Sequence, residues 1–200
     1  MYTTDLIALF IKFFFLLTPP FVISVFLSVT QKHDASQKAS LAVRITLAII
    51  VVSGVLLFFG GFIFSVFGIT INAFKIGTGA ILFLTSVSLV NGSEGAVNVK
   101  GSLHSIAVVP MAIPVTLGPA SVGALVVYGG EIHGFLNQLA AFVTITAAIL
   151  CVGILLWMSS YIEKAIGKSG LVVLSKLTGL ILAALSSQMI FEGIKSFLSL

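Results

Sequence analysis

The chain has 200 residues, of which 58% are hydrophobic and 8% are charged, and its formal net charge is +4. A soluble globular domain carries about a quarter charged residues, so this composition excludes one and indicates an all-α membrane protein. In such a chain, a small positive charge bears on its orientation in the membrane. The sequence has no basic tail or patch, so we do not expect nucleic acid as a partner. The single cysteine, Cys151, excludes an intrachain disulfide.

Six apolar segments are long enough to cross a bilayer, which takes about 20 residues. No basic stretch precedes the first segment and no small-residue cleavage site follows it, so we expect a retained span and not a signal peptide. The links are too short to separate soluble domains, and residues 1–200 are therefore predicted to form a single transmembrane domain. The predicted transmembrane helices are 6–29, 42–66, 72–91, 105–128, 138–160 and 171–191.

The first predicted span is interrupted at its centre by "LLTPPFV", residues 16–22. Pro19 and Pro20 remove two backbone donors and break the hydrogen-bond ladder of a helix. Lipid cannot satisfy the carbonyls that such a break leaves free, so irregular backbone at this depth requires protein or a cavity around it. We expect two half-helices, with Thr18 extended before the first proline and the second half starting just after it.

The chain also resembles itself at a shift of 100 residues. Sixteen of the hundred pairs are identical, whereas composition alone gives roughly nine or ten. Most identities lie in the second and third spans of each half, and Pro19/Pro119 lies in the first. Each half, about 1–100 and 101–200, holds three spans, and an odd number makes the two halves cross the membrane in opposite senses. The sequence therefore predicts two inverted three-helix repeats.

The fourth span carries the counterpart of the first break, "TLGPASV", residues 116–122. Pro110 and Pro114 add strain earlier in the same span. Two breaks at corresponding places in inverted halves indicate a transport site at the midplane of the membrane. The alternative is a set of proline kinks used only for packing, and the register of the prolines favours the site.

The half-helix ends have a chemistry that suits a small zwitterion. Each second half begins with free N–H groups and a partial positive charge, and each first half ends in free carbonyls. A carboxylate fits the former and an ammonium the latter. Because span 4 offers one more amide donor, we expect the carboxylate there and the ammonium near Leu17 and Thr18. The candidate substrate-binding residues are Leu17, Thr18, Pro19, Pro20, Phe21, Val22, Gly79, Pro114, Thr116, Gly118, Pro119, Ala120, Ser121 and Gly179.

Gly79 and Gly179 lie on small-residue faces of the third and sixth spans, which favour close helix packing. Because both glycines recur at the same place in each half, we also predict that they let the backbone of these spans approach a small ligand. Lys75 and Lys176, near the starts of these spans, are expected to snorkel to the interface.

All acidic residues fall in links or near span ends, and metal-ligand spacings and nucleophile–base pairs are missing. We therefore expect no enzyme, no cofactor and no metal.

Lysine and arginine are distributed unevenly between the two sides of the predicted bundle. The links after spans 1, 3 and 5 hold seven basic residues, and the other side holds three. The positive-inside rule then predicts a multi-pass protein of the cytoplasmic (inner) membrane with both termini outside. The first group is Lys32, Lys38, Arg44, Lys100, Lys164, Lys168 and Lys176, and the second is Lys12, Lys75 and Lys195.

Three stretches, "FKIGTGAILFLTSVSLVNG", "AVVPMAIPVTLGPASV" and "GLILAALSSQMIFEGI", resemble the MarC family of bacterial and archaeal membrane proteins, also called the small neutral amino acid transporter family. The resemblance covers essentially the whole chain. It implies six spans and, for some members, export or exchange of alanine- or glycine-like solutes. In the family pattern, span 1 reads Asn-Pro with Gly, Asn and Pro following, and arginines open spans 3 and 6. Here the places in span 1 hold Thr18, Pro19, Phe21, Val22 and Ser24, which makes the first half of the site less polar, and Lys75 and Lys176 replace the arginines.

The sequence thus favours a transporter that exports small neutral amino acids by alternating access around the two breaks. The partners it predicts are a small zwitterionic solute and the lipid bilayer, and a homo-oligomer stays open. Two alternatives remain: a non-transporting membrane scaffold or assembly protein, and an exporter of another small amphipathic solute.

Overall fold

The computed structural model describes residues 3–30, 33–92 and 107–198, and in these ranges the chain forms helices and no strands. Lys32, Lys100 and the first two residues of the predicted span 105–128 lie outside the described residues. The elements are α1 (Thr3–Leu16), α2 (Pro19–Val29), α3 (Ala35–Phe67), α4 (Ile71–Asn91), the π-helix η1 (Ala107–Thr116), α6 (Pro119–Glu131), α7 (Phe135–Trp157) and α8 (Ser159–Phe197).

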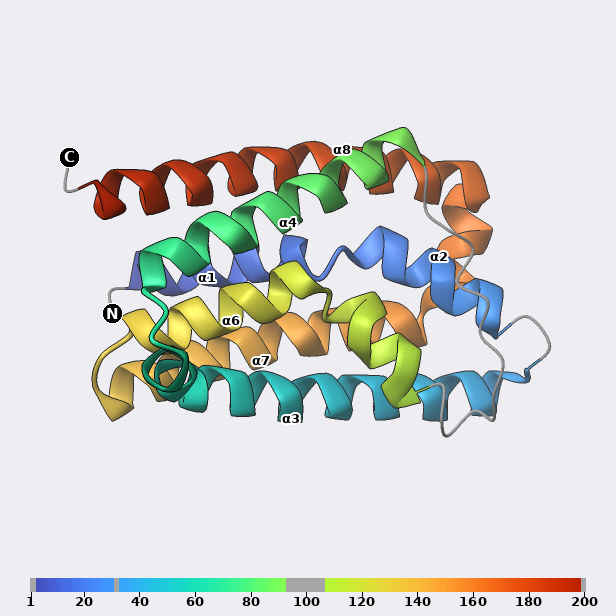
Figure 1. Cartoon of the computed structure of the whole chain (residues 1–200). Helices are drawn as coiled ribbons and strands as arrows, with labels where there is room; N and C mark the ends of the chain where they lie inside the picture. Colours follow the sequence, from blue (N-terminus) through green and yellow to red (C-terminus); the bar gives the residue numbers. More distant parts are fainter. Residues whose placement is uncertain (1–2, 31–32, 93–106, 199–200) are drawn as a thin grey trace.

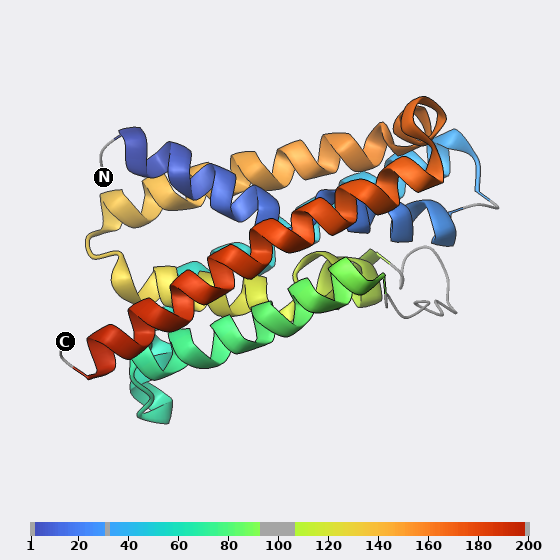
Figure 2. The ribbon, with the colours of Figure 1, turned by 90° about the horizontal axis from the view of Figure 1, so that it is seen from above.

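The helices run along one long direction, and the links between them gather at two ends of the bundle (Figure 1). One end carries both described termini together with the α3–α4 and α6–α7 links, and we call it the terminal end. The opposite end carries the α2–α3 link and the corner at which α8 bends (Figures 1 and 2). The bend falls at Gly167, whose φ of 68° and ψ of 172° lie where glycine has no steric penalty.

Five stretches of the described residues are long and apolar enough to cross a membrane: Asp5–Val29, Ala35–Gly60, Ile71–Asn91, Phe135–Trp157 and Ser159–Phe197. The predicted segment 105–128 corresponds to η1 and α6, which have 10 and 13 residues, so neither alone has the length of a span. The all-helical membrane architecture expected from the composition is therefore confirmed.

Apolar side chains cover the outside of the bundle as well as its core. On α3, large hydrophobic residues recur at a spacing of four on the exposed face, which is the spacing of one side of a helix. Ile45 and Ile49, on the other face of α3, are buried in the core. An outer face of this kind suits hydrocarbon and not water. The exposed stripe consists of Val43, Leu47, Val51, Val55 and Phe59.

α4 and α8 lie side by side over much of their length (Figures 1 and 2). A Cβ built on Gly79 meets the backbone oxygen of Ser186 at 3.1 Å, and one built on Gly179 meets that of Ser86 at 3.0 Å. The absence of a side chain at both positions therefore lets the two backbones approach closely. The four residues form one contact repeated twice with the partners 100 residues apart.

Candidate functional site

The first helix break lies between α1 and α2, at the predicted place. The N–H of Thr18 donates to the carbonyl of Phe15 at 2.9 Å, and the Thr18 carbonyl accepts from the N–H of Val22 at 3.1 Å. Thr18 has φ 47° and ψ 56°, a left-handed conformation, so the prediction that it is extended is wrong. The left-handed turn lets this one residue close the last turn of α1 and open the first turn of α2. For a residue with a Cβ it costs roughly 1–2 kcal/mol.

The second break lies between η1 and α6. The N–H of Leu117 donates to the carbonyl of Ala112 at 2.8 Å, and the hydroxyl of Thr116 donates to that of Met111 at 2.8 Å. The backbone bond of Leu117 reaches back five residues, which is the spacing of a π-helix, and the hydroxyl of Thr116 spans the same distance along the chain. Gly118 has φ −69° and ψ 169°, and α6 begins at Pro119, so the extended residue before a proline and the helix start just after it, which we expected at a break, occur here.

The two breaks are in contact. The hydroxyl of Ser121, in the first turn of α6, donates to the backbone carbonyl of Leu16, the last residue of α1, at 3.0 Å. A buried side chain of one break thus satisfies a carbonyl that the other break would leave free. Of the predicted site residues, those that are buried around this contact are Leu17, Thr18, Pro19, Val22, Thr116, Ala120 and Ser121.

The remaining predicted residues have other surroundings. Phe21 and Gly118 are half-buried. Pro19 and Pro20 line an apolar groove of about 400 Å³ together with residues of α1, α7 and α8. Pro114 lies in η1 and Pro119 begins α6, and their side chains lie outside what the structure describes. Gly79 and Gly179 belong to the α4–α8 contact, so the structure gives them a packing role, and their predicted contact with a ligand stays a prediction.

A cavity of about 200 Å³ lies beside the joined breaks, between α1, α4, α6 and α8. Leu16, whose carbonyl receives the Ser121 hydrogen bond, forms part of its wall. Apolar side chains form most of the rest, and ionic and amide groups lie among them. The lining consists of Lys12, Leu16, Lys75, Leu82, Ala124, Val127, Tyr128, Glu131, Leu185, Gln188, Met189 and Glu192.

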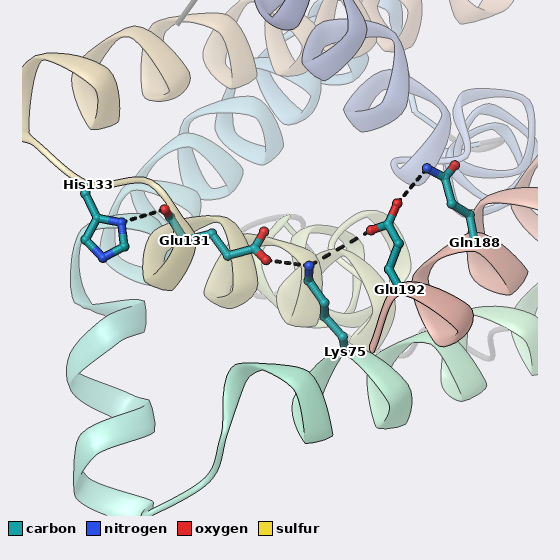
Figure 3. Close-up of polar contacts among 5 residues, drawn as sticks. All are labelled: Lys75, Glu131, His133, Gln188 and Glu192. Carbon is teal, nitrogen blue, oxygen red and sulfur yellow. Dashed lines mark hydrogen bonds and ion pairs between the residues drawn. The ribbon is translucent and has the colours of Figure 1, made fainter. Parts of the chain in front are cut away.

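Lys75 is the centre of an ionic cluster in this cavity (Figure 3). Its ammonium forms an ion pair with Glu131 and lies 4.0 Å from a carboxylate oxygen of Glu192. Gln188 donates from Nε2 to the other carboxylate oxygen of Glu192 at 2.8 Å, and His133 Nδ1 lies 2.8 Å from the backbone oxygen of Glu131. The side chain of Lys75 is only 13% exposed, whereas Glu131 and Glu192 are 38% and 52% exposed.

The prediction that Lys75 snorkels to the interface is therefore wrong, whereas Lys176 is exposed. Lys75 turns inward because two carboxylates from other helices meet it, Glu131 at the end of α6 and Glu192 near the end of α8. The sequence did carry a signal. Lys12, Lys75, Glu131 and Glu192 all fall near span ends that alternating spans place on one face of the membrane. Among the described residues, no group of three or more His, Cys, Asp or Glu side chains is placed to hold a metal ion.

The sequence is similar to those of known proteins over nearly its whole length. The sequence profile of the MarC family integral membrane proteins matches residues 3–198. This chain belongs to the MarC family. It is 30% identical to the UPF0056 membrane protein YhcE of Escherichia coli (strain K12), over 93% of this chain and 90% of that protein. A UPF0056 membrane protein of Methanocaldococcus jannaschii is also 30% identical, over 94% of this chain and 95% of its own length.

A third relative, the UPF0056 membrane protein YvbG of Bacillus subtilis (strain 168), is 27% identical over 95% of this chain and 94% of its own length. These names describe membrane proteins and state no activity. No solved structure matches the chain. Membership of the family and the apolar helices together establish an integral, multi-pass membrane protein.

Proposed function

We propose that this MarC family protein is a transporter that exports small neutral amino acids, of the size of alanine or glycine, by alternating access between its two broken helices. The observation that carries the proposal is the hydrogen bond from Ser121 to the Leu16 carbonyl, which joins the two breaks inside the bundle. Helix ends at membrane depth are tolerated where protein or a cavity satisfies them, and paired breaks of this kind mark transport sites.

The proposal includes six spans arranged as two inverted repeats. Helix boundaries support it, because α1 ends at Leu16 and η1 at Thr116, while α2 begins at Pro19 and α6 at Pro119. Contacts between elements support it as well, since α4 packs on α6 as α8 packs on α2. The glycine contacts between α4 and α8 are a third argument. Gly79 faces Ser186 and Gly179 faces Ser86, so the same pair of residues meets twice with the two halves exchanged.

The cavity beside the breaks lies toward the terminal end of the bundle. The cavity beside Leu16 extends to the ionic cluster of Lys75 and Glu131, residues near the terminal ends of α4 and α6. Beyond the breaks, large core side chains are fully buried: Leu17, Phe26, Met111 and Leu117. With the positive-inside rule, the terminal end is extracellular, and the structure then corresponds to an outward-facing state.

The chemistry of the breaks supports a zwitterionic solute. The first N–H groups of α6, at Ala120 and Ser121, suit its carboxylate, and the carbonyls that end α1 suit its ammonium. In this structure the Ser121 hydroxyl occupies the Leu16 carbonyl and joins the two breaks. A solute that enters between the breaks must replace this hydrogen bond. The protein needs only binding and movement for this function and neither a catalytic group nor a cofactor.

A non-transporting scaffold or assembly protein is the second candidate, and one observation favours it. Around the breaks, the groups described above are already paired within the chain, and their side chains are closely packed. An exporter of another small amphipathic solute would use the same geometry, and the choice of solute separates it from the main proposal.

Calorimetry on the full-length protein in detergent tests the proposed site. Alanine and glycine are expected to bind, whereas the scaffold predicts no binding of either. Gly118→Pro removes a backbone donor at the break, so it should weaken binding of alanine more than Thr18→Ala, which keeps every backbone group. It should also weaken alanine more than alaninamide, which lacks the carboxylate. Equal losses for the two ligands, or a larger effect of Thr18→Ala, would contradict the assignment.

A further inference from the structure

The Lys75 cluster lies in the cavity beside the breaks, and three of its features bear on what could bind there. The first is the unequal burial of its ions. Lys75 is 13% exposed and is held by two carboxylates, both of which are far more exposed than the lysine. Glu131 can turn to water, but an ammonium as little exposed as that of Lys75 carries a large desolvation penalty when it is left unpaired. The partner of Lys75 is therefore readily exchanged only for another carboxylate.

The second feature is what such an exchange leaves behind. When a ligand's carboxylate takes the place of Glu131 on Lys75, the side chains of Glu131 and Glu192 face the same cavity without a full partner. Gln188 already donates to Glu192 and holds it toward the cluster (Figure 3). These carboxylates then accept hydrogen bonds from an ammonium on the same ligand.

The third feature is the size and net charge of the cavity. Its lining carries two lysines, Lys12 and Lys75, and two glutamates, Glu131 and Glu192, so its formal charge is zero. A ligand without net charge enters it without leaving an uncompensated ion. The volume of about 200 Å³ lies below the range of roughly 300–1,000 Å³ that takes drug-sized ligands. The cavity therefore suits a solute of a few heavy atoms.

From these features we infer that the cavity is an access site for a small zwitterion, in which Lys75 takes the carboxylate from Glu131 and the two glutamates take the ammonium. Leu16 forms the inner wall, so a solute bound here lies next to the contact that closes the breaks. The inference rests on the proposed function, because it assigns the same class of solute to a second position along the path.

Protection of a cysteine tests this site without requiring transport. The only native cysteine is replaced by Cys151→Ala, and Leu185→Cys introduces a thiol in the cavity wall. The full-length protein in liposomes is treated with a membrane-impermeant methanethiosulfonate, and the concentration of each ligand that halves labelling is measured. The ligands are alanine, alaninamide, which lacks the carboxylate, and lactate, which lacks the ammonium.

Alanine is expected to protect the thiol, and Lys75→Gln should raise the concentration needed by roughly 10- to 100-fold, the loss of one charge-assisted contact. Protection by alaninamide should change little, because it makes no contact through a carboxylate. Lys176→Gln is the matched control, since this lysine is exposed on α8. Equal shifts for alanine and alaninamide in Lys75→Gln would overturn the inference.

Glu192→Gln gives a second test at an exposed residue, should Lys75→Gln fail to fold. It should weaken protection by alanine roughly 3- to 10-fold and leave lactate unchanged, and equal shifts would again overturn the site. Efflux of labelled alanine measured in the same liposomes separates the two proposals. Efflux without protection would contradict the access site and support the transporter. Protection without efflux would support the access site and contradict the transporter. Absence of both overturns both.

Discussion

The two ends of the α4–α8 pair share one backbone design and differ in their side chains. At the terminal end, Lys75 holds an ion pair beside the cavity. The residue 100 positions later is Ser175, which is 4% exposed and whose hydroxyl has no hydrogen-bond partner among the described residues. Three other residues of the cavity lining have small counterparts 100 positions away: Lys12 pairs with Ala112, Gln188 with Ser88 and Glu192 with Gly92.

This difference separates the repeated packing of the bundle from the proposed access site. The breaks and the glycine contacts occur in both halves, as expected of features that every arrangement of the bundle needs. Among the described residues, the ion pairs of Lys75 occur at one end of the α4–α8 pair, where the cavity lies, and the equivalent position at the other end is a serine. Because the packing is repeated and the Lys75 cluster is not, the proposed access site belongs to one end of the bundle only. Four sets of substitutions test this comparison.

Overpacking the glycine contacts should have the largest effect. Gly79→Leu and Gly179→Leu each place a side chain against backbone of the facing helix, so both should lower stability by about 3 kcal/mol, the upper end of what overpacking costs, and abolish transport. Gly77→Leu is the control, because a Cβ there meets no described atom within 4 Å. Thermal unfolding in detergent measures the three variants. A wild-type midpoint for Gly79→Leu would contradict the close contact.

The ionic end should be sensitive to truncation and its counterpart should not. Lys75→Ala leaves two carboxylates facing each other, and with their partial exposure taken into account it should lower stability by about 1–3 kcal/mol. Ser175→Ala removes a buried hydroxyl that has no partner, so its effect should stay within about 0.5 kcal/mol or be stabilising. Similar losses in denaturation experiments on both variants would remove the asymmetry.

The contact between the breaks should contribute as one buried hydrogen bond. Ser121→Ala leaves the Leu16 carbonyl without this donor and should lower stability by about 1 kcal/mol. Ser24→Ala removes a bond within α2, from the Ser24 hydroxyl to the Pro20 carbonyl, and should have a smaller effect because that helix keeps its own ladder. Chemical denaturation compares the two, and a larger loss for Ser24→Ala would argue against the joined breaks.

The smallest effect concerns the backbone of the first break. Thr18 is left-handed, whereas its counterpart Gly118 is extended, so the glycine stands where it is not required. Thr18→Gly should be more stable than Thr18→Ala by about 1 kcal/mol, because both lose the hydroxyl and only glycine relieves the strain. The midpoints of thermal unfolding decide it. Equal midpoints would mean that Thr18 leaves the left-handed region in the membrane.

Much of this architecture follows from the sequence. The prolines fix the breaks because they remove donors whatever surrounds them, and the repeat predicted that both breaks lie at matching places. The conformation of Thr18 did not follow, since it depends on a turn that both flanking helices must share. Lys75 was misread because an isolated lysine near a span end normally reaches for water. Its inward position requires Glu131 and Glu192, which lie far away along the chain.

Efflux of labelled alanine and glycine from liposomes that contain the purified protein tests the central claim most directly. The account predicts faster efflux than from protein-free liposomes, a lower rate with Gly118→Pro, and a wild-type rate with Gly77→Leu. Efflux no faster than the protein-free control for both amino acids, from protein shown to be folded, would contradict the account.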